Sequence, residues 1–128
     1  MSKSYKFIKY DEEIADAMAI FNELHKKDSA RNRFTVVDAF VLSLVHSYHY
    51  TNSRCFASNK YIASKILTTE PTVQKSINKL SDMNFIDRKA AYNNGTRHRV
   101  LIYNEEAVEK FKSDMQNVLF DYDEKIDL

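Results

Sequence analysis

Residues 55–86 read CFASNKYIASKILTTEPTVQKSINKLSDMNFI and contain two helical patterns separated by only a few residues. The first pattern follows Ser58, whose hydroxyl can accept a hydrogen bond from a free N–H of a first helical turn. The second follows Thr69, a residue of the same capping type. Pro71 then falls in the first turn, where its missing N–H has no intrahelical partner to lose. The stretch therefore predicts two short helices joined by a tight turn.

Each of these helices should bury one apolar face and leave the other polar. The inward residues of the first are expected to be Tyr61, Ile62, Ala63, Ile66 and Leu67, and those of the second Val73, Ile77, Leu80 and Met83. Asn84 is expected to end the second helix, because its short polar side chain lowers the cost of a positive φ. The outward residues of the second helix are Thr72, Gln74, Lys75, Asn78, Lys79 and Ser81.

A β-hairpin is expected directly after the second helix. Asn93-Asn94-Gly95 lies between two strand-like runs, and Asn-Gly at such a position is the strongest short-range hairpin signal. Gly95 is the only glycine of the chain, and it falls at the position where the turn of a hairpin favours glycine. The hairpin is basic, with Arg88, Lys89, Arg97 and Arg99. Helix, turn, helix and basic hairpin together predict a winged helix, with the hairpin as the wing.

A third helix is needed to complete the core, and residues 34–50 supply it. Thr35 and Asp38 have the spacing of a capping box, with Asp in place of the usual Glu. The apolar face that follows comprises Val37, Phe40, Val41, Leu44, Val45 and Tyr48. Residues 54–56 are expected to form a short strand that pairs with the wing.

The segment from Ser58 to Ile86 resembles the helix-turn-helix domains of phage and plasmid proteins, which include replication initiators and small regulators. The matching positions are filled by Phe56, Ala57, Ser58, Ile62, Ala63, Ile66, Thr69, Thr72, Val73, Leu80 and Ile86. The resemblance covers residues 34–103 and implies a winged helix-turn-helix fold that binds DNA. Leu67 departs from the pattern, because Gly or Asn usually closes the turn and a left-handed Leu costs about 1–2 kcal/mol. Glu70-Pro71 also departs from it, because a polar or basic pair is frequent there.

Two further segments show helical spacing of apolar residues, one on each side of residues 34–103. They are Ile14, Met18, Phe21 and Leu24 within residues 11–27, and Ala107, Val108, Phe111, Met115, Val118, Leu119 and Tyr122 within residues 105–122. We expect one mainly α domain over residues 1–128, with flanking helices added to the winged helix. We also expect a homodimer, in which the flanking helices pack across a twofold axis. The predicted interface residues are Val108, Phe111, Met115 and Leu119. The alternative is that the two flanking helices pack on each other inside one monomer.

Composition supports a small cytoplasmic protein. With 128 residues and 44% apolar side chains, the chain can build one core, and a single glycine and a single proline do not suit a β-sandwich. No apolar run is long enough for a membrane span, which takes about 18 residues. No apolar signal region follows the first basic residues. One cysteine excludes an internal disulfide and fits a reducing compartment.

The net charge of +1 is unevenly distributed along the chain. Residues 1–34 carry a net charge of +1, residues 35–103 carry +5 and residues 104–128 carry −5. A basic middle region and an acidic tail are typical of a nucleic-acid-binding core with a remote scaffold.

No pattern in the chain predicts catalysis. A single glycine leaves no Gly-rich phosphate loop and no dinucleotide fingerprint. His46 and His49 lie near Cys55, but a structural zinc site takes about four ligands and no fourth is evident. His98 is better explained as a contact of the wing than as a general base. We therefore expect no enzymatic activity, cofactor, metal or small-molecule substrate, and no membrane partner.

The hypothesis from the sequence is a small phage- or plasmid-type regulator, such as a transcriptional repressor, that binds double-stranded DNA. The expected base contacts are Thr72, Gln74, Lys75 and Asn78, because amides, Lys and Thr suit base edges in the major groove. The expected phosphate contacts are Lys60, Lys79, Arg88, Lys89, Arg97 and Arg99. One alternative is action at a replication or transfer origin. Another is a winged-helix module that binds protein and not DNA.

Overall fold

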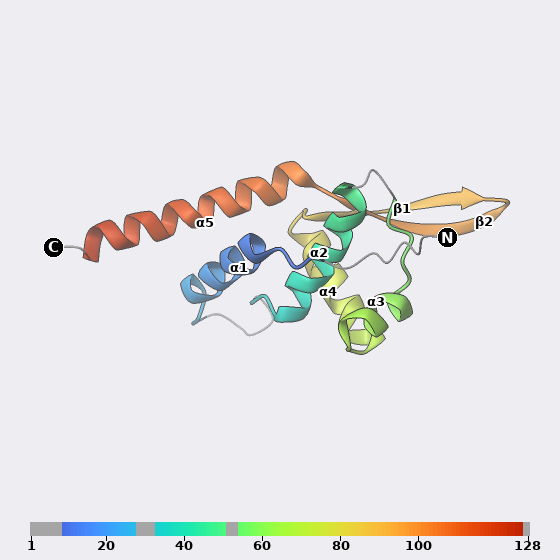
Figure 1. Ribbon diagram of the computed structural model, residues 1–128, viewed down its shortest axis with the longest axis horizontal. Coiled ribbons are helices and arrows are strands. Elements are labelled where there is room, and N and C mark those ends of the chain that lie inside the picture. Colours follow the sequence, from blue (N-terminus) through green and yellow to red (C-terminus); the bar gives the residue numbers. More distant parts are fainter. Residues whose placement is uncertain (1–8, 28–32, 51–53, 127–128) are drawn as a thin grey trace.

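The computed structural model describes residues 9–27, 33–50 and 54–126, which form helices and one antiparallel hairpin (Figure 1). The elements are α1 (Glu12–Leu24), α2 (Val36–Tyr50), α3 (Asn59–Ile66), α4 (Glu70–Asp82), β1 (Ile86–Asn93), β2 (Thr96–Tyr103) and α5 (Glu105–Ile126). The predicted fold class, a mainly helical winged helix-turn-helix with added terminal helices, is confirmed. None of the helices described is long and apolar enough to cross a lipid bilayer.

The helix-turn-helix forms from α3 and α4, and both caps are the predicted residues. Ser58 Oγ accepts a hydrogen bond from the N–H of Tyr61 at 3.1 Å, and Thr69 Oγ1 accepts one from the N–H of Thr72 at 3.4 Å. Between the helices, Leu67 adopts a left-handed conformation with φ 57° and ψ 51°. This conformation is strained for a residue with a Cβ, so the tight turn is maintained at some energetic cost.

Two residues assigned to the inward face of the first helix point outward instead. Leu67 is 91% exposed, because α3 ends at Ile66 and the left-handed turn removes Leu67 from the helical period. Tyr61 is 40% exposed and lies on the outer face of α3, where the ammonium of Lys65 sits 5.3 Å from its ring centroid. Ile62 and Ala63 are the residues of α3 that enter the core.

The capping box predicted for α2 is present. The N–H of Asp38 donates to Thr35 Oγ1 at 3.3 Å, and the N–H of Thr35 donates to Asp38 Oδ2 at 2.8 Å. The middle of the helix that follows is internal, with Ala39, Val41, Leu42, Leu44 and Val45 buried, whereas its two ends are exposed. Because α2 contacts α3, α4 and β2, it is the central element on which the helix-turn-helix and the wing are mounted.

The wing is a regular hairpin that extends from one end of the molecule (Figure 1). Its turn holds Asn94 at φ 52° and Gly95 at φ 77°, as a two-residue loop with both central residues left-handed requires. The predicted short strand is present as an isolated bridge, in which the N–H of Leu101 donates to the carbonyl of Cys55 at 2.9 Å.

The flanking helices α1 and α5 pack on each other, and their core is continuous with that of the winged helix. Phe111 of α5 lies among three other aromatic rings, with centroid distances of 5.9 Å to Phe21, 5.8 Å to Phe34 and 5.0 Å to Phe85. The far half of α5 continues past the end of α1, at the opposite end of the molecule from the wing (Figure 1).

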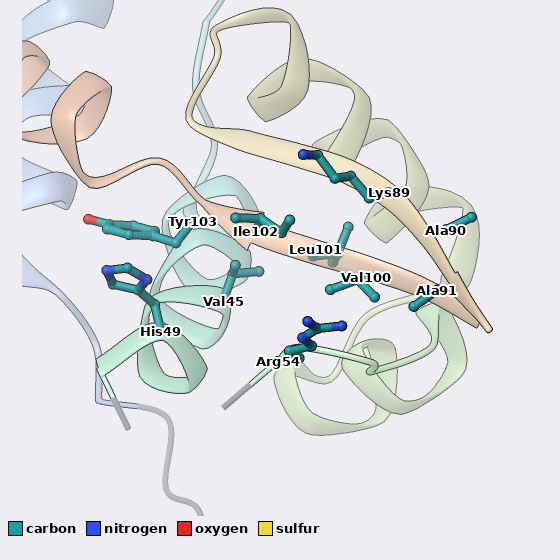
Figure 2. A pocket seen from close by; sticks show the side chains of 10 residues that line it. All are labelled: Val45, His49, Arg54, Lys89, Ala90, Ala91, Val100, Leu101, Ile102 and Tyr103. Atoms are coloured by element: carbon teal, nitrogen blue, oxygen red, sulfur yellow. The ribbon is translucent and has the colours of Figure 1, made fainter. Parts of the chain in front are cut away.

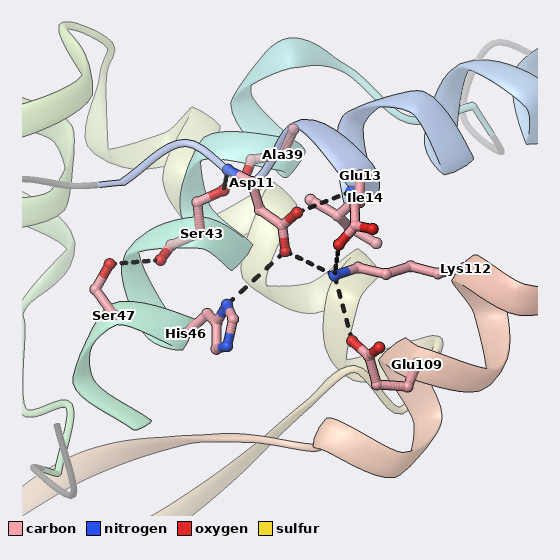
Figure 3. A network of polar contacts seen from close by, with 9 residues as sticks. All are labelled: Asp11, Glu13, Ile14, Ala39, Ser43, His46, Ser47, Glu109 and Lys112. Carbon is pink, nitrogen blue, oxygen red and sulfur yellow. Dashed lines mark hydrogen bonds and ion pairs between the residues drawn. The ribbon is translucent and has the colours of Figure 1, made fainter. Parts of the chain in front are cut away.

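A polar cluster joins α1, α2 and α5 beside this core (Figure 3). Lys112 Nζ lies 2.8 Å from Asp11 Oδ2 and 3.3 Å from Glu109 Oε2. The N–H of Asp11 donates to Ser43 Oγ at 3.0 Å, and His46 Nδ1 lies 3.8 Å from Asp11 Oδ2. Burial raises the pKa of Asp11, but the hydrogen bond from Lys112 and the other favourable contacts outweigh it, so the pKa is lowered. Burial likewise opposes the charge of Lys112, yet its carboxylate partners raise its pKa.

Candidate nucleic-acid interface

The surface formed by α4 and the adjoining hairpin carries the residues predicted to contact bases. Lys75 and Asn78 are exposed on α4, whereas Thr72 and Gln74 are partly buried. The hydroxyl of Thr72 lies 2.9 Å from that of Thr69, so it is already engaged at the start of the helix. Lys75 and Asn78 are therefore the members of this set that a ligand can reach most freely.

A continuous chain of hydrogen bonds crosses this surface from one strand of the wing to the other. Arg99 Nη1 donates to Asn59 Oδ1 at 2.6 Å, and Asn59 Nδ2 donates to Gln74 Oε1 at 2.7 Å. Gln74 Nε2 then donates to Asn78 Oδ1 at 3.0 Å, and Arg88 Nη1 donates to the same oxygen at 2.6 Å. We call Asn59, Gln74 and Asn78 the amide chain. It holds α3, α4 and the wing in one register before any ligand arrives.

The two arginines at the ends of the amide chain differ in exposure. Arg99 is half-buried, and its Nη2 also donates to the carbonyl of Ala57 at 2.6 Å. Burial lowers its pKa, although an arginine remains charged in proteins. The phosphate contact expected of Arg99 does not fit this position, because its donors are directed into the protein. Arg88 is exposed, and its one hydrogen bond in the amide chain runs from Nη1 to Asn78.

The hairpin places its cations on both faces, because side chains alternate along a strand. Arg88 and Arg97 share one face with Arg99, since β1 and β2 pair Arg88 with Leu101 and Tyr92 with Arg97. Lys89 belongs to the opposite face. There it lines a hollow of about 390 Å³ together with Arg54 (Figure 2), and its Nζ lies 3.9 Å from Asp87 Oδ2. Lys89 thus does not join the surface that carries Asn78.

Lys79 is also unavailable for the predicted phosphate contact. Its Nζ donates to the carbonyl of Arg33 at 2.6 Å and to Asp38 Oδ2 at 3.0 Å. The side chain of Asp38 is only 2% exposed, and a buried carboxylate needs a cation close by. Lys79 supplies that cation and ties α4 to the start of α2. Lys60 and Arg97, by contrast, are exposed.

The residues predicted for a dimer interface divide into an inner pair and an outer pair. Val108 is fully buried and Phe111 is 9% exposed, both inside one monomer, so an interface role does not fit them. The physical reason is that the apolar stripe of α5 covers the core formed with α1 and the phenylalanine cluster. Met115 is half-buried and Leu119 is 45% exposed, so these two remain accessible. The side chain of Tyr122 lies outside the described residues.

Sequence reasoning missed Asn59, which links the wing to α4. Its partner Arg99 lies 40 residues further along the chain, and no local pattern marks such a pair. It also missed the environment of His46, whose ring stacks on Tyr103 with centroids 4.3 Å apart. Burial lowers the pKa of His46. In the described part of the chain, no group of three or more His, Cys, Asp or Glu side chains is arranged to hold a metal ion.

Comparison with known proteins found a matching family for the central part of the chain and solved structures with a similar fold. Residues 35–86 match a family described as a helix-turn-helix domain. No curated protein matches the chain by sequence. A solved structure described as a possible transcriptional regulator from Methanosarcina mazei Go1 is similar over 98% of this chain and 91% of its own, with 15% identity and a TM-score of 0.54. MepR, a transcription regulator of the Staphylococcus aureus multidrug efflux pump MepA, is similar over 90% of this chain and 73% of its own, with 16% identity and a TM-score of 0.47. Residues 35–86 are thus similar in sequence to the helix-turn-helix domain family, and the fold of the chain is that of a winged helix-turn-helix.

Proposed function

We propose that this protein binds double-stranded DNA through α4 and the wing, and that it regulates transcription. The observation that carries the proposal is the exposed polar side of α4 next to a hairpin face with Arg88 and Arg97. An exposed helix of a helix-turn-helix domain fits the major groove, where Lys75 and Asn78 can reach base edges. The net charge of +5 over residues 35–103 suits a phosphate backbone.

The contacts we propose are fewer than the sequence suggested. Lys75 and Asn78 read bases, whereas Gln74 and Thr72 are partly buried and contribute less. Lys60, Arg88 and Arg97 neutralise phosphates, which positions the domain without reading sequence. We do not propose phosphate contacts for Lys79, Lys89 and Arg99. Lys79 pairs with Asp38, Lys89 lies on the opposite face of the hairpin, and the donors of Arg99 are directed into the protein.

A homodimer is part of this proposal. One monomer offers few accessible cations, so its affinity for DNA should be modest and sensitive to salt, and two copies on two half-sites would overcome this. The outer half of α5, with Met115 and Leu119, is the surface we propose for the contact. On the sequence resemblance, we further propose a cytoplasmic regulator of phage or plasmid type. Action at a replication or transfer origin is the alternative within the same chemistry.

A gel-shift series with duplex DNA that flanks the native gene tests the proposal, with random duplex as competitor. We expect a discrete band that survives the competitor and is lost in Lys75→Ala. Lys110→Ala is the matched control, because this substitution removes the same charge at a position on α5, away from α4 and the wing. Lys110 pairs there with Asp114 at 2.8 Å. Absence of any shift, or equal loss in both variants, would contradict DNA binding by α4. Absence of any shift would favour a module that binds protein through the acidic α5.

The dimer is tested separately by sedimentation. Leu119→Asp should give a folded monomer, because Leu119 is 45% exposed in the monomer. Phe111→Asp should unfold the protein, because it places a charge inside the aromatic cluster. A wild-type protein that sediments as a monomer at all concentrations and on its DNA would refute the dimer without affecting the proposal for α4.

A further inference from the structure

The two arginines that bond to the ends of the amide chain, Arg99 and Arg88, fix the direction of every hydrogen bond within it. A guanidinium group can only donate, so the oxygen of Asn59 must face Arg99 and the nitrogen must face Gln74. Gln74 then presents its oxygen to Asn59 and its nitrogen to Asn78. From the other end, Arg88 also requires the oxygen of Asn78. Rotating any one amide by half a turn would bring two donors together, so the orientations follow from the geometry.

This arrangement leaves Asn78 with donors only. Its Oδ1 accepts from Gln74 Nε2 at 3.0 Å and from Arg88 Nη1 at 2.6 Å, and an amide oxygen has two acceptor sites. Among the described residues, Nδ2 of Asn78 has no hydrogen-bond partner, and the residue is exposed. A free asparagine offers one donor and one acceptor side by side. Asn78 in this protein offers two N–H groups.

The distinction matters because bases differ in what they present in the major groove. Adenine presents an acceptor, N7, beside a donor, the N6 amino group, and a free asparagine matches both. Guanine presents two acceptors, N7 and O6. Asn78 cannot accept from adenine without losing the bond from Gln74 or the bond from Arg88. The bond from Arg88 is the stronger of the two, because bonds from charged donors are about twice as strong as neutral ones.

We propose that Arg88 is a specificity-determining residue, which makes Asn78 a donor-only contact and so selects guanine over adenine. The inference rests on the proposed function, because it assumes that α4 lies in the major groove. Arg88 acts here as a positioning residue through its hydrogen bond to Asn78, in addition to the positive charge that it places near phosphate. Removing its charge alone would weaken all sequences equally, whereas removing its hydrogen bond changes which base is preferred.

The test is selection from a duplex library randomised across the site, with wild type, Arg88→Met and Arg97→Met. Arg97 is the matched control, because it is exposed on the same face of the hairpin and carries the same charge. Asn78→Ala identifies the base pair read by Asn78, as the one whose preference disappears. Circular dichroism verifies that each variant is folded.

We expect wild type to select guanine at that base pair, and Arg88→Met to shift the ratio of adenine to guanine by about tenfold toward adenine. Arg97→Met should bind all sequences more weakly with the wild-type preference. Selection of adenine by wild type, or an unchanged preference in Arg88→Met, would overturn the inference and leave DNA binding intact. If wild type enriches no sequence, the proposed function fails and the inference fails with it.

Discussion

Two groups of basic side chains in this molecule differ in what surrounds them. Lys79 and Lys112 lie against carboxylates with little exposure, 2.8–3.0 Å from Asp38 and Asp11, and they join helices. Lys75 and Arg88 lie on the open surface of α4 and the wing. A lysine on α4 therefore has no role that its position on the helix alone determines. The nearest buried carboxylate decides whether it supports the fold or remains available to a ligand.

The largest effect should separate two lysines of the same helix. Lys79→Met leaves the carboxylate of Asp38 buried without its cation, so we expect a loss of about 3 kcal/mol in the free energy of unfolding. Lys75→Met should leave that free energy nearly unchanged and weaken DNA binding. Urea denaturation and a binding titration of both variants measure the difference. Equal destabilisation by the two substitutions would refute the distinction between lysines that are paired with a buried carboxylate and lysines that are exposed.

Lys112→Met tests the second lysine that is paired with a carboxylate, at the cluster that joins α1, α2 and α5. We expect a loss of about 2 kcal/mol, because Asp11 loses its main partner while Glu109 remains in contact with water. The pKa of Asp11 is lowered in the folded protein, so its pairing stabilises the fold above pH 3.8 and is lost as the pH falls through the lowered value. In Lys112→Met the pKa of Asp11 should rise, and acid unfolding should begin at a higher pH. Urea midpoints between about pH 2 and 7 measure this shift. An unchanged acid limb would mean that Lys112 does not stabilise the Asp11 carboxylate.

A smaller effect is expected at Asn59, which links the wing to α4 beside the exposed basic residues. Asn59→Ala breaks the amide chain between the wing and α4, so Gln74 loses its fixed orientation. We expect DNA affinity to fall by about 1 kcal/mol, with near-normal thermal stability. Fluorescence anisotropy with Asn117→Ala as control, an exposed residue of α5, checks this. Equal affinities in the two variants would show that the chain does not preorganise the surface.

The smallest effect concerns the turn that sets the two helices. Leu67→Gly should raise the free energy of unfolding by about 0.5–1 kcal/mol, because glycine adopts a left-handed conformation without a Cβ clash. Lys65→Gly, in the last turn of α3, should instead lower it by a similar amount, about 0.5–1 kcal/mol. Thermal denaturation compares them. A loss of stability in Leu67→Gly would mean that the exposed side chain contributes more than the strain costs.

The sequence predicted those features whose partners are close in the chain. Ser58, Thr69 and the Thr35–Asp38 box each act within three residues, and the Asn94-Gly95 turn is local as well. The roles of basic residues were not predictable in this way. Lys79 meets Asp38 across 41 residues, so nothing near Lys79 distinguishes it from Lys75.

The same reason limits the prediction of the flanking helices. The apolar period of α5 was read correctly, but a period does not say what covers the stripe. Phe111 meets Phe21 and Phe34, which lie far away in the sequence, and this removes it from any outer surface. Of the four residues predicted for an interface, Met115 and Leu119 keep part of the exposure that an interface requires.

The most direct test of DNA binding by α4 and the wing is a two-dimensional NMR titration of the protein with duplex DNA that contains its selected site. We predict that the largest shifts occur in the side-chain amides of Asn59, Gln74 and Asn78 and along the Arg88 face of the wing. The hollow lined by Arg54 and Lys89 should change little. Shifts concentrated in that hollow or on α5, with the amide chain unaffected, would contradict the assignment of α4 and the wing as the DNA-binding surface.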